Sequence, residues 1–405
     1  MRVLVIGAGG VGSAVVRIVS RWGLFERVVV ADRDADRARR AVADAGERFV
    51  AVCHDAQDEE ATGQLIRAER CDAVLNAVDP RFVMPIFRAA LASGATYLDM
   101  AMSLSRPDPK DPFRTPGVKL GDEQFAMADE WERRGQLALC GIGVEPGLSD
   151  VFARYASDRL FSTMEEIGVR DGANLTVQGY DFAPTFSIWT TIEECLNPPV
   201  VWEREKGWFV TEPFSEPEVF AFPAGIGPLE CVNVEHEEVV LIPRWIDAGR
   251  VTFKYGLGRE FIEVLKTLHK LGLDSRSPVK VGATEVSPRD VVAACLPDPA
   301  TLGELMTGVT CAGTWVRGTG VDGSPREVYL HHVVDNEWTM AEFGSQAVVW
   351  QTAVNPVVAL ELLESGAWGG AGVLGPEALP AEPFLELLSA HGSPWACEER
   401  TVTSR

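Results

Sequence analysis

The first 150 residues alternate short apolar runs with stretches in which apolar residues recur every three or four positions. The short runs predict buried strands, and the periodic stretches predict amphipathic helices. Strands that alternate with helices build a parallel sheet covered on both faces, so we expect a doubly wound α/β sheet. The expected strands are 3–6, 28–31, 49–53, 71–77, 96–99 and 137–140, and the expected helices are 13–20, 35–45, 59–69, 82–93 and 125–134.

The pattern changes after about residue 150. Between residues 166 and 334, alternating runs separated by turn signals such as Asp322-Gly323 and Asp171-Gly172 predict antiparallel strands, one of which includes the stretch EHEEVVLIP. Helical periodicity returns at 346–364, with an expected interruption at Asn355-Pro356, and again at 384–390. We therefore predict one domain from residues 1–150 and 345–405, in which the C-terminal tail completes the parallel sheet. Residues 151–344 are predicted to form an inserted α+β domain, built on a mostly antiparallel sheet, for substrate binding or dimerisation.

Gly7, Gly9 and Gly12 follow the first expected strand at the spacing G-x-G-x-x-G, and Asp32 ends the second strand about 20 residues later. In this context the first glycine permits a tight turn, the second lets the backbone approach a pyrophosphate, and the third lets helix and strand pack closely. The pyrophosphate is expected at the helix N-terminus, where free N–H groups attract an anion. The pattern therefore predicts a dinucleotide-binding Rossmann sheet.

The residues after the next strands predict how the cofactor binds. A carboxylate at Asp32 accepts hydrogen bonds from ribose hydroxyls and repels a 2′-phosphate, which favours NAD. Arg33 leaves NADP open, because a guanidinium can bind a phosphate or stack on adenine. Asp55 is expected to meet the adenine amino group or to cap a turn. Asn76 and Ala77 lie at the end of the fourth strand, where we expect the nicotinamide ribose, with an ordinary turn as the alternative.

Ligands bind beyond the carboxyl ends of strands in such sheets, so the strand ends supply candidate catalytic residues. Tyr97 and Asp99 lie two positions apart and share one side of the fifth strand. A phenol and a carboxylate there suit proton transfer or the binding of a substrate ammonium. The structural alternative is that Tyr97 fills space in the sheet and Asp99 caps a loop. Glu145 is expected to face the nicotinamide, with Pro146 and Gly147 beside the substrate.

Three candidates lie in the inserted region. His236 is expected in a strand, where a role in proton handling competes with a structural one. Arg244 is expected to bind a substrate carboxylate through two parallel hydrogen bonds, with a surface ion pair as the alternative. Trp189 belongs to an aromatic group that is expected at the substrate site, in the core or in a dimer interface.

Composition excludes several classes of function. The net charge of −22 argues against nucleic-acid binding and gives only weak support to an amine substrate. The eight cysteines are scattered without C-x-x-C spacing, so we expect no metal site. No apolar segment is long enough to span a bilayer, and the chain enters a strand at once, so we expect no membrane association and a cytoplasmic protein.

Several stretches in order along nearly the whole chain resemble the saccharopine dehydrogenase-like family, which includes saccharopine reductase, lysine ε-dehydrogenase and the carboxynorspermidine and homospermidine synthases. The stretches are VLVIGAGGVGSAV, DAVLNAVDP, GATYLDMA, GIGVEPGLSDVFARYA, EHEEVVLIPR, FKYGLGREFIEVLKTLHKLGLDS and GAWGGAGVLGPE. The resemblance adds Gly10 and Val11 to the cofactor motif. FKYGLG departs from the family's usual Arg-Tyr-x-Gly-His, which puts the standard substrates in question.

The resemblance implies an NAD(P)-dependent oxidoreductase that transfers a hydride at a C–N bond of an amino acid or polyamine precursor, by imine reduction or amine oxidation. It also implies a homodimer. Two alternatives stay open. One is oxidative deamination of the lysine ε-dehydrogenase type, and the other is a non-catalytic sensor or scaffold that binds a dinucleotide.

Overall fold

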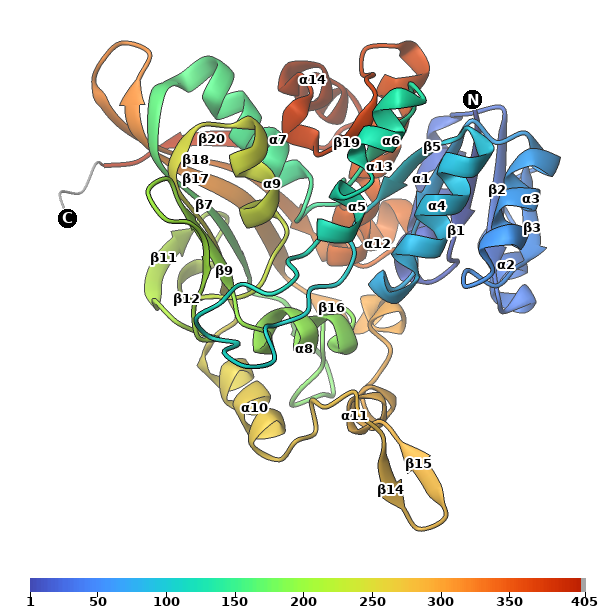
Figure 1. Ribbon diagram of the computed structural model, residues 1–405, viewed down its shortest axis with the longest axis horizontal. Coiled ribbons are helices and arrows are strands. Elements are labelled where there is room, and N and C mark those ends of the chain that lie inside the picture. Colours follow the sequence, from blue (N-terminus) through green and yellow to red (C-terminus); the bar gives the residue numbers. More distant parts are fainter. Residues whose placement is uncertain (402–405) are drawn as a thin grey trace.

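The computed structural model describes residues 1–401. Two sheets lie side by side, and helices from several parts of the chain cover them (Figure 1). The main cluster of buried apolar side chains includes residues of both halves, so the halves share a continuous core. The helices of the described residues include none with the length and apolar character needed to cross a membrane.

Within residues 1–401, the first sheet has seven parallel strands in the order β19-β6-β5-β4-β1-β2-β3. β1 lies between β4 and β2, so the direction of winding reverses beside β1. This order confirms the predicted doubly wound α/β fold. The strands are β1 (Arg2–Ile6), β2 (Arg27–Asp32), β3 (Phe49–Cys53), β4 (Ala73–Asn76), β5 (Thr96–Asp99), β6 (Leu137–Leu139) and β19 (Gly372–Leu374).

The C-terminal tail completes this sheet, as predicted, because β19 pairs in parallel with β6. The long helix before β19 packs on the first helix of the chain and is buried on nearly all sides. Pro356 lies inside this helix without ending it, so the predicted interruption is wrong. The helices of this half are α1 (Gly10–Trp22), α2 (Ala35–Val42), α3 (Glu59–Glu69), α4 (Val83–Ser93), α5 (Asp122–Phe125), α6 (Ala128–Arg133), α13 (Ala347–Ser365) and α14 (Ala381–Ala390).

The second sheet of the described chain has nine strands and is mostly antiparallel, as predicted. Its central strand, β7, pairs antiparallel with β17 and parallel with β13. The strands are β7 (Phe161–Ala173), β9 (Val200–Glu203), β10 (Gly207–Val210), β11 (Glu218–Phe222), β12 (Gly227–Asn233), β13 (Ala248–Gly256), β17 (Val309–Gly320), β18 (Pro325–Asp335) and β20 (Ala396–Glu399).

Two predictions about this half are wrong. The stretch around His236 is not a strand, because β12 ends at Asn233 and a helix, α9 (Glu238–Trp245), follows. An apolar run that is buried on several sides cannot be assigned to strand or helix from its pattern alone. The last strand, β20, pairs with β18 rather than with the first sheet, so the predicted domain range 345–405 does not hold for it. Residues 402–405 of that range lie outside the described residues.

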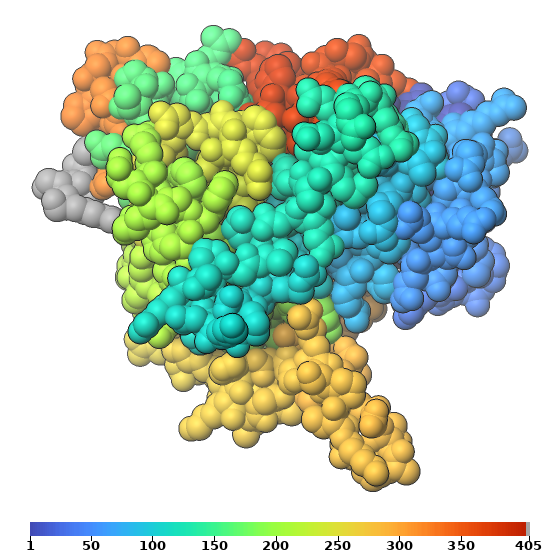
Figure 2. Space-filling model, viewed as in Figure 1, coloured from blue at the N-terminus to red at the C-terminus, as the bar shows by residue number. Residues whose placement is uncertain are grey.

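The remaining elements include one hairpin that stands apart from both sheets. Figures 1 and 2 show that the hairpin of β14 (Val279–Val281) and β15 (Thr284–Val286) projects from the body. The others are α7 (Leu148–Tyr155), α8 (Ile188–Leu196), α10 (Arg259–Lys270), α11 (Pro288–Cys295), α12 (Asn336–Phe343), β8 (Thr176–Val177), β16 (Met306–Thr307), η1 (Pro80–Phe82), η2 (Ala156–Leu160), η3 (Pro299–Thr301), η4 (Gly303–Leu305) and η5 (Pro376–Ala378).

The loop between β5 and α5 lies across the boundary between the two halves. Figure 2 shows this segment, in teal, between the blue surface of the first sheet and the green surface of the second. Arg106 and Val118 form a bridge within it, and Ser105 accepts a hydrogen bond from Asn197 Nδ2 at 3.3 Å. This loop is therefore held against the second half.

Candidate active site

The glycine turn joins β1 to α1 and fits a pyrophosphate. Gly7 has a φ of +106°, and a Cβ at Gly12 would lie 1.9 Å from the carbonyl oxygen of Gly7. At Gly9, in contrast, a Cβ would meet none of the described atoms within 4 Å. Gly7 and Gly12 thus close the turn, while Gly9 leaves open space before the first N–H groups of α1, where an anion binds favourably.

Asp32 connects the end of β2 to this turn. Its buried carboxylate accepts the backbone N–H groups of Ala8 at 2.9 Å and Asp34 at 2.8 Å. Each oxygen keeps a second lone pair, so the predicted bonds from ribose hydroxyls are compatible with this arrangement. Arg33 and Asp55 are exposed at the same sheet edge, and their roles toward the adenosine stay predictions.

Asp55 also has a local structural role. Its Oδ1 accepts the N–H of Gln57 at 3.0 Å, which caps the turn after β3. This is the alternative that the sequence left open, and it leaves the second oxygen of Asp55 for a ligand.

A cleft of about 550 Å³ lies beyond the carboxyl ends of β1 and β4. Four predicted cofactor residues line it: Gly10, Val11, Asn76 and Ala77. The opposite wall comes from β7, α8 and β13, and Ala300 of η3 lies next to Gly10. The cleft therefore begins at the glycine turn and ends against the second sheet.

Carboxyl groups dominate the polar lining of the cleft. None of the described side chains that line it belongs to Lys, Arg or His. Those carboxyl groups that are ionised attract a cationic ligand, and no basic side chain of the described lining repels one. The acidic lining residues are Asp79, Glu145, Asp171, Glu194, Glu237 and Asp298.

Glu145 and Asp171 meet in this cleft from different halves of the molecule. Glu145 follows β6, whereas Asp171 lies in β7, and their carboxyl groups are hydrogen-bonded to each other. Burial raises the pKa of Asp171 to about 7. Burial, and then the charge of Asp171, raises the pKa of Glu145 well above its usual range. The pair therefore shares a proton near neutral pH.

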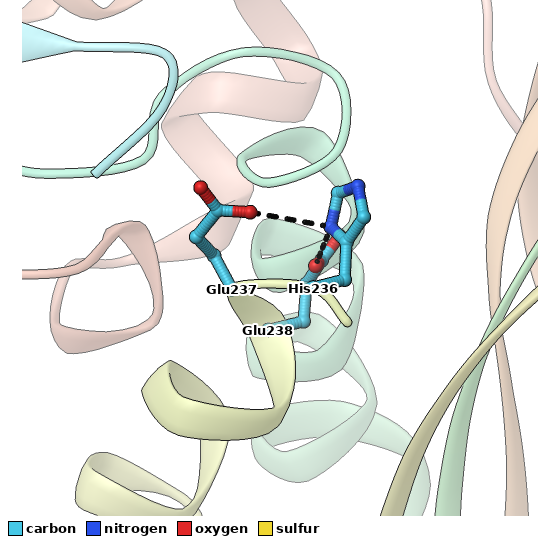
Figure 3. A group of neighbouring side chains, drawn as sticks. All are labelled: His236, Glu237 and Glu238. Carbon is cyan, nitrogen blue, oxygen red and sulfur yellow. Dashed lines mark hydrogen bonds and ion pairs between the residues drawn. The ribbon is translucent and has the colours of Figure 1, made fainter. Parts of the chain in front are cut away.

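His236, Glu237 and Glu238 lie together at the start of α9 (Figure 3). His236 Nδ1 is 2.5 Å from Glu238 Oε2 and 3.5 Å from Glu237 Oε2. Burial alone would lower the pKa of His236, but these carboxylates and Glu194 raise it to about 10, so the imidazole is cationic at neutral pH. Tyr255, which lines the cleft, has its hydroxyl 3.5 Å from His236 Nε2.

The same three residues at the start of α9 have ligand atoms within 4.8 Å of one another, a spacing that suits a metal ion. The short hydrogen bond to Glu238 already occupies Nδ1 of His236. The expected absence of a metal stays a prediction.

Tyr97 and Asp99 are buried, and neither is among the described residues that line the cleft. The Tyr97 hydroxyl donates to Asp99 Oδ2 at 2.9 Å and accepts from Asn76 Nδ2 at 3.0 Å. Asp99 Oδ1 accepts the N–H of Gly141 at 2.7 Å, and burial raises the pKa of Asp99 to about 7. The two predicted catalytic residues therefore orient Asn76, which does line the cleft.

The predicted neighbours of Glu145 lie as expected only in part. Pro146 lines the cleft. Gly147 has a φ of +137°, and a Cβ there would lie 2.1 Å from the carbonyl oxygen of Gly143. Gly147 therefore shapes the loop that presents Glu145.

Two predicted substrate residues are not brought to the cleft. The indole N–H of Trp189 donates to Asp290 at 3.2 Å, and the ring contacts Arg81 and Arg289. The guanidinium of Arg244 lies 3.7 Å from the centre of the Phe125 ring. Neither residue is among the described lining residues, so their positions do not fit direct contact with a substrate in the cleft.

Sequence reasoning missed most of the lining, including Asp171, Glu194, Glu237 and Tyr255. Glu237 and Tyr255 had a signal, because they lie in the EHEE and FKYGLG stretches. Asp171 and Gly172 were expected to form a turn, but both lie inside β7, so that prediction is wrong. Glu194 had no signal, since an acid in a helix is an ordinary surface residue until the fold turns it inward.

Comparisons with known proteins match both halves of the chain to one family. Residues 3–139 match the saccharopine dehydrogenase NADP binding domain, and residues 143–393 match the saccharopine dehydrogenase C-terminal domain. Carboxynorspermidine synthase from Vibrio alginolyticus is 29% identical, over 98% of this chain and 97% of that protein. Carboxyaminopropylagmatine dehydrogenase from Synechocystis sp. is 27% identical, over 97% and 96%.

Solved structures show the same fold. Saccharopine dehydrogenase (L-Glu forming) from Saccharomyces cerevisiae has a TM-score of 0.68 at 14% identity, covering 99% of this chain and 100% of that one. Homospermidine synthase from Legionella pneumophila, solved in complex with NAD, has a TM-score of 0.66 at 14% identity, covering 98% and 91%.

Proposed function

The chain belongs to the saccharopine dehydrogenase family, and we propose that it reduces an imine formed between a di- or polyamine and a carbonyl compound. The two family-model matches confirm the resemblance seen in the sequence, and the chain is an NAD(P)-dependent oxidoreductase. In the proposed reaction, the amine and the carbonyl group lose water to give an imine. A hydride and a proton then convert the imine to a secondary amine.

One observation carries the proposal: six carboxyls and no described cationic side chain line the cleft. A protonated diamine matches such a lining, because each ammonium offers three N–H donors. An amino acid would bring a carboxylate into the same acidic space. The cleft therefore favours a diamine over lysine as the amine substrate. The relatives named carboxynorspermidine synthase and carboxyaminopropylagmatine dehydrogenase support an amine-rich product.

Residues of one wall bind the cofactor, and residues of the opposite wall bind the substrate. The N–H groups at the start of α1 hold the pyrophosphate, Asp32 holds the adenosine ribose, and Asn76 orients the nicotinamide ribose. When bound, NAD(P)H supplies the hydride. The acidic side chains on the opposite wall hold the ammonium groups of the substrate.

A substrate panel tests the proposal. NADH and NADPH oxidation is followed with diamines of three to five carbons, matched monoamines and lysine, each combined with aldehydes that do or do not carry a carboxylate. We expect turnover with a diamine and an aldehyde together, and at least tenfold lower kcat/KM with the monoamine of equal length. Turnover of lysine with NAD⁺ and no carbonyl partner would instead support oxidative deamination. Cofactor binding without turnover across the panel would contradict the proposed reaction.

The predicted homodimer is also a proposal. Light scattering on the purified chain at several concentrations tests it, and a mass near 44.0 kDa throughout would contradict it.

A further inference from the structure

We propose that Glu145 and Asp171 form the subsite for one ammonium group of the substrate, and that the ammonium replaces the proton the two carboxyls share. This inference rests on the proposed function, because it specifies where the amine binds and what leaves when it does.

The geometry presents both carboxyls to the cleft. Asp171 lies in the central strand β7, between Tyr255 of β13 and Ala312 of β17. Glu145 comes from the opposite half, on a loop that the N–H of Gly147 ties to Asp150 Oδ2 at 2.8 Å. Glu145 Oε1 is buried, and no described N–H or hydroxyl group donates to it. The pair thus crosses the boundary between the halves and keeps an unused acceptor.

The groups around the pair supply no free positive charge from the described elements. His236 is the one cation among them, and Glu238 holds it in an ion pair. The other groups are carboxyls, phenols and a thiol, so only a proton or a cationic ligand can balance the pair. The titratable neighbours are Glu238 at the start of α9, His236 before it, Glu194 of α8, Tyr255 of β13, Cys311 of β17 and Tyr329 of β18.

The exchange balances in charge and protons. Before binding, one carboxyl is protonated and donates to the other, ionised one. An ammonium that enters donates one N–H to each carboxylate, and the displaced proton leaves to solvent. Its third N–H can reach the unused acceptor of Glu145. Because the amine competes with a proton, its affinity rises with pH as long as the shared proton is still present.

Proton release on binding tests this directly. The full-length protein, saturated with NAD⁺, is titrated with 1,3-diaminopropane by calorimetry in buffers of different ionisation enthalpy. We expect about one proton released per diamine near pH 7, and affinity that rises about tenfold per pH unit from pH 6 to 7. In Asp171→Asn and in Glu145→Gln, proton release should fall toward zero and affinity should drop about tenfold. Glu165→Gln, an exposed acid on the same strand, should behave as wild type.

The outcomes separate this subsite from the proposed function. If the wild type binds the diamine without releasing a proton, or if both variants release as many protons as the wild type, the proposed subsite is wrong. Turnover in the substrate panel would still support the proposed function in that case. Absence of both binding and turnover with every diamine overturns the two together. Circular dichroism and thermal unfolding of each variant show whether it is folded, and Glu145→Gln provides a second measurement if Asp171→Asn does not fold.

Discussion

The two walls of the cleft are built in opposite ways. The wall on the first sheet uses backbone: open N–H groups at the start of α1, a turn that only glycine allows, and Asp32 bound to the N–H of Ala8. The wall on the second sheet uses carboxyl side chains from β7, α8 and the start of α9. One wall attracts an anion and the other a cation. A backbone site depends on local conformation, whereas a side-chain site depends on which distant segments the fold brings together.

Substitution in the glycine turn should have the largest effect. In Gly12→Ala, the added Cβ would lie 1.9 Å from the Gly7 oxygen, so the turn must move. We expect loss of NADH binding, followed by cofactor fluorescence, and a free energy of unfolding lower by about 1–3 kcal/mol or more. Gly9→Ala is the matched control, because its Cβ meets no described atom within 4 Å. It should keep wild-type stability and lose affinity only. Equal losses of stability in both would contradict a backbone-built wall.

Replacing Asp32 should have the next largest effect. Asp32→Ser removes the carboxylate expected to bind the ribose hydroxyls. Hydrogen bonds to a charged group contribute about 1.5–3 kcal/mol, so the Kd for NADH should rise about tenfold or more, with NADPH less affected. Asp44→Ser, at an exposed acid after α2, serves as the control. NADPH bound far more tightly than NADH by the wild type would refute the assignment of Asp32.

Tyr97→Phe separates a positioning role from a catalytic one. The substitution removes the hydroxyl between Asn76 and Asp99 and leaves buried polar groups unpaired. We expect the free energy of unfolding, measured in urea, to fall by about 1–3 kcal/mol. KM for the cofactor should rise while kcat falls less than tenfold. A fall in kcat of a hundredfold or more with unchanged stability would instead identify Tyr97 as a proton donor.

Arg244→Gln should have the smallest effect. Arg244 contacts the Phe125 ring and lies 3.9 Å from Asp122, away from the described lining of the cleft. Loss of the contact with the ring should cost about 0.5–1 kcal/mol of stability. KM values for carboxylate-bearing aldehydes should not change. A KM increase confined to those aldehydes would support the carboxylate-binding role expected from the sequence.

The parallel sheet could be predicted closely because each of its elements has a strong local pattern. The expected strands 49–53 and 96–99 coincide with β3 and β5. The helix α9, which ends at Trp245, could not be predicted from the sequence. It is buried on several sides, and its apolar run has no clear period. Tyr97 and Asp99 were correctly placed on one side of β5, but the pattern does not tell whether that side faces the cleft or the core.

The sequence alone determined the cofactor half of the site. The glycines, Asp32 and Asn76 act within a single strand–turn–helix unit and its neighbours, where spacing along the chain specifies geometry. Only the tertiary structure decided the substrate half. Glu145, Asp171, Glu194 and Glu237 lie far apart in the sequence, and each alone fits a solvated acid. Burial beside one another raises their pKa values, so these four carboxyls keep protons at a pH at which solvated acids would have lost them.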